Sequence, residues 1–303
     1  MDYAAWKLFI DAVERGSLSK VAMAYGTSQP HVSRQISELE EKCGGRLFQR
    51  TGRGVVLTEL GQQIAPKVRA WLAGTEQLEN DIRTSAGTPI GTVRIGSLPS
   101  TAHPLITHLY YRLRDRYPLI RLVVREGQGA QLERWLEDGS VDLAILFRTS
   151  PTPKNGDTYL VETATYLVGA MGDPLTAGPT VPFSALHNLP LVTFCRPSSW
   201  RNLLEQLSIE QGISLNVALE ADSISLQTHI VADGVMYALL GPFAIATASK
   251  YLDLQSSEVI DPTVTRHIAL AMSPHGQLTP ACRTVMQVTR EIAQSGGAEL
   301  VMP

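Results

Sequence analysis

The feature that most constrains this 303-residue chain is a pair of short helical segments separated by a glycine near the N-terminus. The segment Gly16–Glu41 reads GSLSKVAMAYGTSQPHVSRQISELEE, with apolar residues at helical spacing on both sides of Gly26. Glycine adopts a left-handed turn conformation at little cost, and Thr27 or Ser28 can then cap the second helix. Pro30 falls in that helix's first turn, where its missing N–H removes no hydrogen bond. The sequence therefore predicts two helices that meet across a tight turn.

The second helix has an apolar side and a polar side. Val32, Ile36 and Leu39 repeat at i, i+4 and i+7 and form the stripe that we expect to be buried. The other side carries short hydrogen-bonding side chains and an arginine, which suit base edges and phosphates in a DNA major groove. This pattern predicts a helix-turn-helix, with a solvated helix of a three-helix bundle as the alternative. The candidate DNA-binding residues here are Ser28, Gln29, Pro30, His31, Ser33 and Arg34.

A short hairpin follows. Leu47–Phe48 and Val55–Leu57 are apolar runs that bracket the turn RTGRG, which is rich in arginine and glycine. The pattern predicts a wing whose Arg50 and Arg53 contact the phosphate backbone or a narrow minor groove. An ordinary surface hairpin is the alternative, and the neighbouring helix-turn-helix favours the wing.

The distribution of charge supports a nucleic-acid-binding region near the N-terminus. The chain has 26 Lys+Arg against 29 Asp+Glu, a formal net charge of −3. Between Arg15 and Val56, however, seven basic residues stand against three acidic ones. A local basic excess on an acidic protein is typical of a small DNA-binding domain joined to a larger body. The chain shows neither a signal peptide nor an apolar run near the roughly 18 residues of a membrane span. We therefore expect a cytoplasmic protein with no membrane partner.

A long helix and an α/β region follow the hairpin. From Thr58, apolar residues recur at spacings near 3.5, which predicts a helix to about Ser85 with a partner helix along it. A helix packed within one domain is the alternative. Pro66 should bend this helix. From Thr92, short apolar strands alternate with helices in two similar sets, and the chain then returns through RHIALAMS. The alternation predicts two α/β lobes built on parallel sheets.

Taken together, the region Gly16–Gln62 resembles the LysR family of transcriptional regulators. The resemblance rests chiefly on SQPHVSRQISELE and LFQRTGRGVVLTELG, in that order and spacing. The later segments SLPSTAHPLI, REGQGAQLERWLEDGSVDLAILF and VTFCRPSSWRNLLEQ are similar to the branch of the family that includes the nitrogen assimilation control protein. The chain departs from the family pattern at Lys20–Ala22 and at His31, so the bound DNA sequence does not carry over.

The resemblance implies an all-α winged helix-turn-helix domain and a long linker helix, followed by an α/β effector part. That part would have two Rossmann-like lobes of the periplasmic-binding-protein type II kind. The implied divisions are residues 1–57 for the DNA-binding domain, 58–86 for the linker and dimerisation helix, 87–92 for a hinge, 93–161 with 267–303 for lobe I, and 162–266 for lobe II. The expected partners are double-stranded DNA at an interrupted palindrome, a small-molecule effector, and further copies of the chain in a dimer or a tetramer of two dimers.

Ligands of such lobes bind beyond the carboxyl ends of strands, at helix N-termini. Hydroxyl groups stand at two predicted helix starts, and the free N–H groups there suit a small anion. Arg148 and Arg196 are candidates to pair with a carboxylate. Helix caps with no further role are the alternative. With the positions implied by the resemblance, the candidate effector-binding residues are Ser100, Thr101, Gln128, Gly129, Phe147, Arg148, Arg196, Ser198, Ser199 and Trp200.

The sequence contains no pattern that identifies an enzyme. It lacks a Gly-x-Ser-x-Gly elbow, a P-loop and a Rossmann glycine fingerprint, and its seven histidines show no metal-binding spacing. We expect no catalytic residues, no metal site and no cofactor. Cys43, Cys195 and Cys282 are too few and scattered for a disulfide framework or zinc site, and a redox role for Cys195 and Cys282 is a weaker alternative. A purely ligand-binding secreted protein would need the signal peptide that this sequence does not show.

Overall fold

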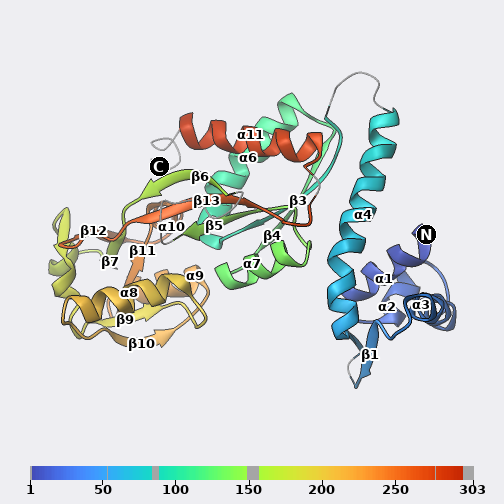
Figure 1. Ribbon diagram of the computed structural model, residues 1–303. Helices are drawn as coiled ribbons and strands as arrows, with labels where there is room; N and C mark the ends of the chain where they lie inside the picture. The colour runs from blue at the N-terminus through green and yellow to red at the C-terminus, as the bar shows by residue number, and fades with distance from the viewer. Residues whose placement is uncertain (1, 53, 84–88, 149–156, 277, 296–303) are drawn as a thin grey trace.

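The computed structural model describes residues 2–52, 54–83, 89–148, 157–276 and 278–295. An N-terminal head (residues 2–57) lies at the base of a long helix, and a larger α/β body extends from the other side of that helix (Figure 1). The body contains two sheets, one of five strands and one of six. We call the five-stranded sheet with its helices lobe I, and the six-stranded sheet with its helices lobe II.

The head consists of α1 (Tyr3–Arg15), α2 (Leu18–Ala24), α3 (Gln29–Cys43) and the antiparallel hairpin of β1 (Phe48–Thr51) and β2 (Gly54–Leu57). Each helix begins at a side-chain cap, because Asp2, Ser17 and Ser28 accept hydrogen bonds from N–H groups of the first turn. Gly16 and Gly44 adopt the left-handed conformation that ends α1 and α3. The apolar sides of the three helices share one core.

The long helix α4 (Glu59–Arg83) contacts both the head and the body, and Pro66 lies inside it. Val68 and Leu72 in its first half are buried in the head core. Arg69 reaches the body instead, where its Nη1 donates a hydrogen bond of 2.6 Å to the Asp138 carbonyl oxygen of lobe I. In the second half, Leu78 is 60% exposed. The prediction that a partner helix runs along α4 therefore concerns its second half, because the first half already packs within the chain.

Lobe I comprises β3 (Gly91–Ser97), α5 (Pro99–Thr101), the π-helical turn η1 (Ala102–Ile106), α6 (Thr107–Arg116), β4 (Ile120–Glu126), α7 (Gly129–Glu137), β5 (Leu143–Arg148), β6 (Thr158–Thr163), β13 (Arg266–Met272) and α11 (Pro280–Ser295). Its strand order is β4-β3-β5-β13-β6. Helices α6 and α11 cover one face of the sheet and α7 covers the other (Figure 1). Of the predicted hinge, residues 87 and 88 lie outside the described residues, whereas residues 91 and 92 already belong to β3.

Lobe II comprises β7 (Tyr166–Ala170), the 3-10 turns η2 (Pro174–Thr176) and η3 (Phe183–Leu186), β8 (Thr180–Pro182), β9 (Pro190–Thr193), α8 (Ser199–Glu210), β10 (Asn216–Glu220), α9 (Ile224–Ala232), β11 (Tyr237–Leu240), α10 (Pro242–Ala248) and β12 (Leu254–Ile260). Its strand order is β10-β9-β11-β7-β12-β8. Residues of α8 pack on one face of this sheet, and residues of α9 and α10 pack on the other.

Both sheets are mixed, so the prediction of parallel sheets is wrong in this respect. Strand β13 runs antiparallel to β5 and β6, and β7 runs antiparallel to β11 and β12. The chain leaves lobe I at the end of β6 and returns at the start of β13, so these two neighbouring strands run in opposite directions. The apolar pattern of a strand does not specify its direction. The same pattern does not single out β6, β8 or β12 as strands.

Two adjacent segments, residues 164–165 and 261–265, connect the lobes. They are joined at the lobe II side by a hydrogen bond of 2.9 Å from the Val259 N–H to the Thr165 carbonyl oxygen. One hydrophobic cluster also spans the two lobes, with buried residues of α7 and β5 on one side and of β9 and β11 on the other. The two lobes therefore meet at a shared core beside a double connection.

Candidate functional site

Helix α3 is held with one side buried and the other open to solvent. Gly26 has a φ of 60°, and the Ser28 hydroxyl accepts a hydrogen bond of 3.4 Å from the His31 N–H. Val32 and Leu39 of the apolar stripe are 0% and 2% exposed. The predicted turn, cap and buried stripe are thus confirmed, and together they fix which side of the helix faces outward.

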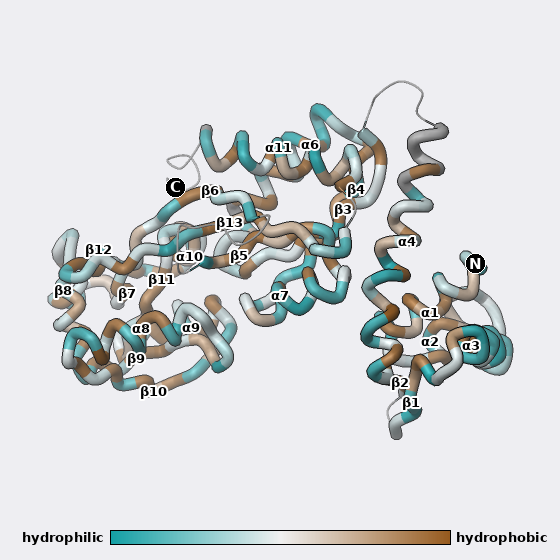
Figure 2. Tube along the Cα trace, viewed as in Figure 1, coloured by the Kyte–Doolittle hydropathy of each residue, from teal (hydrophilic) through white to brown (hydrophobic). Residues whose placement is uncertain are grey.

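The outward side of α3 is polar, and the helix is mostly hydrophilic along its length (Figure 2). The Arg34 side chain is 67% exposed, and its Nε lies 3.8 Å from Oε1 of Glu38. An exposed ion pair of this kind stabilises a protein little, so the guanidinium is available to another partner. Among the predicted DNA-binding residues of α3, Gln29 and Ser33 are half-buried, and the exposed ones are Ser28, Pro30, His31 and Arg34.

The hairpin of β1 and β2 lies beside this polar side. Arg50 donates from Nη2 to the Ser33 hydroxyl at 3.3 Å. Gly54 lies against the turn after α1, where an added Cβ would come within 2.1 Å of the Gly16 carbonyl oxygen. That close approach requires glycine and fixes the wing against the helices. Arg53, the other predicted wing residue, lies outside the described residues.

A buried carboxylate joins α3 to the wing. Glu40 is 7% exposed and accepts hydrogen bonds from the N–H groups of Leu47 at 2.9 Å and Phe48 at 3.1 Å. It also accepts one from Arg46 Nη1 at 2.8 Å. Hydrogen bonds to an ionised group are stronger than neutral ones, so this residue positions the wing. Glu40 is not among the predicted site residues, and the one signal for it in the sequence is its place on the apolar side of the helix, four residues after Ile36.

A second candidate site is a cavity of about 220 Å³ between the two lobes. Its lining comes from the beginnings of α5 and α7 in lobe I, from the loop after β9 and the beginning of α8 in lobe II, and from the first residue of β13. The fold therefore brings together parts of the chain that are distant in sequence. The predicted effector-binding residues that line the cavity are Ser100, Gln128, Gly129, Phe147, Arg196, Ser198, Ser199 and Trp200.

Two predicted effector-binding residues, Thr101 and Arg148, do not line this cavity. Thr101 is 1% exposed, and its hydroxyl donates to the Leu98 carbonyl oxygen at 3.2 Å. Arg148 donates from Nε to Asp157 Oδ2 at 2.7 Å and also forms an ion pair with Glu133. Thr101 thus caps the turn after β3, and the charge of Arg148 is already neutralised by two carboxylates.

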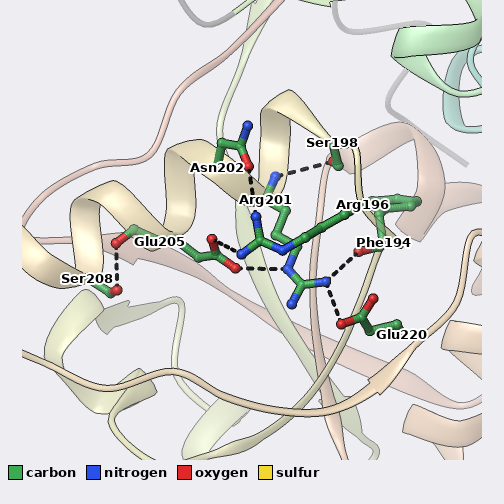
Figure 3. Close-up of polar contacts among 8 residues, drawn as sticks. All are labelled: Phe194, Arg196, Ser198, Arg201, Asn202, Glu205, Ser208 and Glu220. Carbon is green, nitrogen blue, oxygen red and sulfur yellow. Dashed lines mark hydrogen bonds and ion pairs between the residues drawn. The ribbon is translucent and has the colours of Figure 1, made fainter.

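Arg196 lines the cavity, but its guanidinium turns towards α8 (Figure 3). Its Nη2 lies 2.5 Å from Oε2 of Glu205, and Arg201 Nε donates to the same carboxylate at 2.9 Å. Burial alone raises the pKa of Glu205, but the hydrogen bonds from Arg201 and Arg196 outweigh it and hold the pKa below its usual value. Arg196 therefore already has an ionised partner.

Arg266, the first residue of β13, also lines the cavity, and the sequence analysis does not identify it. It is 7% exposed, and its Cζ lies over the rings of Trp200 and Phe147, 4.2 Å and 5.4 Å from their centroids. Within the part of the chain that the structure describes, its guanidinium has no hydrogen bond and no ion pair. Burial lowers the pKa of Arg266 to about 10, so the side chain is still charged at neutral pH.

The charged side chains around the cavity are mostly positive. Arg134 lines it together with Arg196 and Arg266, and Asp222 is the acidic residue of the lining. The Asp222 carbonyl oxygen accepts a hydrogen bond of 3.0 Å from Gln128 Nε2, a contact between the two lobes. The first residues of α7 and α8 also line the cavity, and the free N–H groups at helix N-termini favour negative charge.

The cysteines do not form a redox pair in this structure. All three are free thiols. Burial and the nearby Asp222 raise the pKa of Cys195 in the cavity wall, and burial raises the pKa of Cys282 in lobe I to about 11. A raised pKa keeps a thiol protonated and unreactive, which disfavours the redox alternative.

Neither a metal cluster nor a membrane helix is found in the described part of the chain. There, no three histidine, cysteine, aspartate or glutamate side chains come together in a group that could hold a metal ion. No helix among the described residues has the length and apolar character needed to cross a membrane.

Two family models match the chain. The model described as "LysR substrate binding domain" matches residues 86–294, and the model described as "Bacterial regulatory helix-turn-helix protein, lysR family" matches residues 3–62. Similar proteins include the "Nitrogen assimilation regulatory protein nac" of Klebsiella aerogenes, which is 27% identical over 289 residues, covering 95% of this chain and 94% of that protein. The protein of the same name from Escherichia coli strain K12 is 26% identical, with 97% and 96% covered.

Solved structures share the fold over almost the full length. A cysteine-to-aspartate variant of full-length OxyR from Pseudomonas aeruginosa matches with a TM-score of 0.75 at 18% identity, covering 97% of this chain and 95% of that one. Full-length CbnR in complex with its target DNA matches with a TM-score of 0.67 at 17% identity, covering 96% and 99%.

A winged helix-turn-helix joined through a long helix to two α/β lobes around a cavity defines a DNA-binding regulator that senses a ligand. The family models cover both parts. This chain belongs to the LysR family of bacterial transcriptional regulators. The predicted fold class and functional class are thereby confirmed, including the two lobes of the periplasmic-binding-protein type II kind. Because the matched family regulates transcription, the expectation that the chain is not an enzyme is also confirmed.

Proposed function

We propose that this protein binds an interrupted palindrome in double-stranded DNA as a dimer, in the cytoplasm, and alters transcription when a small molecule occupies the cavity between its lobes. The observation that carries the DNA-binding half is the exposed polar side of α3 held beside Arg50 of the wing. Short polar side chains and an exposed arginine on one side of a helix can form hydrogen bonds with base edges in the major groove.

The recognition surface in this proposal combines two kinds of contact. Arg34 reads a base edge, because its exposed guanidinium can donate two parallel hydrogen bonds to guanine. Arg50 and Arg53 contact the phosphate backbone or the minor groove from the wing. The side chains that complete the surface on α3 are Ser28, Gln29, Pro30, His31 and Ser33.

Self-association follows from the form of the head. One head covers a single half-site, and a two-fold dimer presents two heads to a palindrome. We assign the dimer contact to the second half of α4, where Leu78 is 60% exposed and is not part of the head core. Two such dimers form the proposed tetramer, and they bend the DNA between their sites.

The effector half of the proposal rests on the cavity between the lobes. Its wall contains eight of the residues assigned to effector binding, namely Ser100, Gln128, Gly129, Phe147, Arg196, Ser198, Ser199 and Trp200. A ligand there contacts both lobes at once, so it changes the balance between two lobe arrangements. We propose residues 1–57 as the DNA-binding domain, 58–86 as the linker and dimerisation helix, 87–92 as the hinge, 93–161 with 267–303 as lobe I, and 162–266 as lobe II.

Selection of bound duplexes from a random pool, with the full-length protein at physiological salt, tests this function. We expect an enriched palindrome whose half-sites lie about one helical turn or more apart. A variant with Arg34→Ala and Arg50→Ala is the matched control, because both side chains are exposed and the head should fold without them. No enrichment with the unaltered protein, or equal enrichment with the control, would contradict the proposed DNA-binding surface.

A further inference from the structure

We infer that the effector is a small anion, and that Arg266 binds its oxyanion group, with a carboxylate as the first candidate. This inference rests on the proposed function, because it assigns the chemistry of the same cavity. Arg266 stands outside the set of residues that the sequence predicts, so the structure alone carries the assignment.

Arg266 lacks the carboxylate partners that the other buried arginines of the described residues have. Within the described residues, Arg148 pairs with Asp157 and Glu133, and Arg201 pairs with Glu205. Arg266 is 7% exposed, and none of the described residues forms a hydrogen bond or an ion pair with its guanidinium. A buried charge is costly unless it is paired and hydrogen-bonded. A ligand anion would supply the partner that the chain itself supplies to the other buried arginines.

The second argument is the way the guanidinium is held. The Arg266 Cζ lies over the Trp200 ring, 4.2 Å from its centroid, at a distance typical of a cation–π contact. On another side, an added Cβ at Gly241 would lie 3.4 Å from Arg266 Nε, so glycine there leaves the group its space. The five N–H donors of a guanidinium point outward in the plane of the group, and the contact with the Trp200 ring does not require them. The side chain is thus held in place with its donors free for a planar oxyanion.

The third argument is the surrounding charge and the size of the cavity. Arg134 lines the same space, and the beginnings of the nine-residue helix α7 and the twelve-residue helix α8 add free N–H groups. Asp222 is the one acidic residue of the described lining. The cavity of about 220 Å³ is below the roughly 300–1,000 Å³ of sites for drug-sized ligands. These features favour a small anion over a neutral or cationic ligand.

The first experiment compares acids with their uncharged amides. Binding of formate, acetate, butyrate, succinate and nicotinate to the full-length protein is measured by titration calorimetry, beside formamide, acetamide, butyramide, succinamide and nicotinamide. Inorganic phosphate and sulfate form a further arm. We expect at least one acid to bind and its amide to bind at least ~10-fold more weakly, because a hydrogen bond to a charged group is lost. Tighter binding of phosphate or sulfate would identify an inorganic or phosphorylated anion instead.

The second experiment places the anion at Arg266. The Arg266→Met variant should bind the preferred acid ~10–100-fold more weakly. Arg116→Met is the control, because Arg116 lies on α6 of the same lobe, its ion pair with Glu291 is exposed, and it is outside the cavity lining. We expect the control to bind the acid as the unaltered protein does. If Arg266→Met fails to fold, the acid and amide comparison on the unaltered protein decides the charge of the ligand.

Each remaining result has a defined meaning. If none of the acids or inorganic anions binds, formate and acetate at high concentration included, the inference is overturned. Equal binding of acids and amides, or full binding of the acid by folded Arg266→Met, also overturns it. These outcomes leave the DNA-binding proposal intact if duplex selection still enriches a palindrome. Failure of that selection, with acids still bound through Arg266, would overturn the DNA-binding proposal instead.

Discussion

The polar side of α3 and the cavity between the lobes both present an arginine that can take an external partner, but in opposite environments: Arg34 has only an exposed pair with Glu38, and Arg266 has no partner among the described residues. Arg34 in the head has a side chain that is 67% exposed, whereas Arg266 is 7% exposed and its Cζ lies over the rings of Trp200 and Phe147. Water solvates an exposed cation, so leaving it unpaired costs little, whereas the same group in a buried site destabilises the fold until a partner arrives. The first arrangement suits a long polyanion that docks from outside, and the second suits a small anion that is enclosed.

A third arrangement in the molecule provides the reference for this comparison. Arg201 is buried on α8, and it pairs with Glu205 at 2.9 Å and with Glu220 at 2.7 Å. Glu40 in the head is likewise buried and fully hydrogen-bonded. Charges of this kind are structural, because their partners come from the same chain. Substitutions at the three kinds of position should therefore change different measured quantities.

The largest effect is expected at the buried, paired charge of the head. Glu40→Ala leaves the N–H groups of Leu47 and Phe48 without their acceptor, so we expect the head to lose ~3 kcal/mol of stability. Amide hydrogen exchange at these two positions measures the loss. Glu38→Ala, which removes only the exposed pair with Arg34, should change stability by less than ~0.5 kcal/mol. Similar exchange rates in the two variants would contradict the expectation that a buried, hydrogen-bonded carboxylate stabilises the head more than an exposed one.

The next effect is expected at the exposed arginine of α3. Arg34→Ala should cost ~1–3 kcal/mol of binding to the selected site and relax the preference for one base. Binding to unrelated duplexes should change much less, because base contacts carry the specificity. Lys42→Ala, an exposed change in the last turn of the same helix, is the control. An equal loss on selected and unrelated DNA would assign Arg34 to the phosphate backbone.

A smaller and more uniform effect is expected at the wing. Arg50→Ala should weaken binding to all duplexes to a similar extent and reduce the slope of log K against log salt by about 1, because one phosphate contact is lost. Filter binding or anisotropy over a range of salt concentrations measures this slope. A loss confined to the selected site, with the slope unchanged, would show that Arg50 reads sequence.

The smallest effect is expected at Glu205, whose contribution to stability depends on pH. Hydrogen bonds from Arg201 and Arg196 hold the pKa of Glu205 below its usual value of 4.5, against the opposing effect of burial. The folded state therefore binds fewer protons there than the unfolded state, so this stability is present above the unfolded pKa and is lost as the pH falls through the lower folded pKa. We expect Glu205→Gln to cost up to ~1 kcal/mol at neutral pH. The difference between the variant and the unaltered protein, as measured by thermal unfolding, should shrink as the pH falls below the usual pKa of 4.5. A constant difference across that range would exclude the ionised pair.

Local sequence was enough to predict the head, because its signals are short-range. Gly26, Ser28 and Pro30 fix the turn and the helix start, and the stripe from Val32 to Leu39 fixes the buried side. None of these needs information about a distant part of the chain. Glu40 was not predicted, because its partners at Leu47 and Phe48 become visible only when the wing folds back on the helix.

The cavity was predicted only in part, because its wall depends on how distant segments meet. Helix starts such as Ser198 carry a local signal, and the structure places this one in the lining. Arg148 is the last residue of the apolar strand β5, and Arg266 is the first residue of the apolar strand β13. Their different roles depend on the residues that the fold places beside them. Asp157 reaches Arg148, whereas Trp200 reaches Arg266. The return strand RHIALAMS was predicted, but the antiparallel direction of β13, which carries Arg266 to the cavity, could not be deduced from its apolar pattern.

Arg266 is the first residue after the second connection between the lobes, which gives it a mechanical position as well as a chemical one. If the lobes rotate about their two connecting segments, a contact close to that rotation axis exerts almost no torque on either lobe. A ligand that touches Arg266 alone would therefore be held without turning one lobe against the other. To change the arrangement of the lobes, the ligand has to extend to the beginnings of α7 and α8, which contact it farther from the connecting segments. Occupancy and signalling are thus separable, and an anion too short to reach both helices should fill the site as a silent competitor.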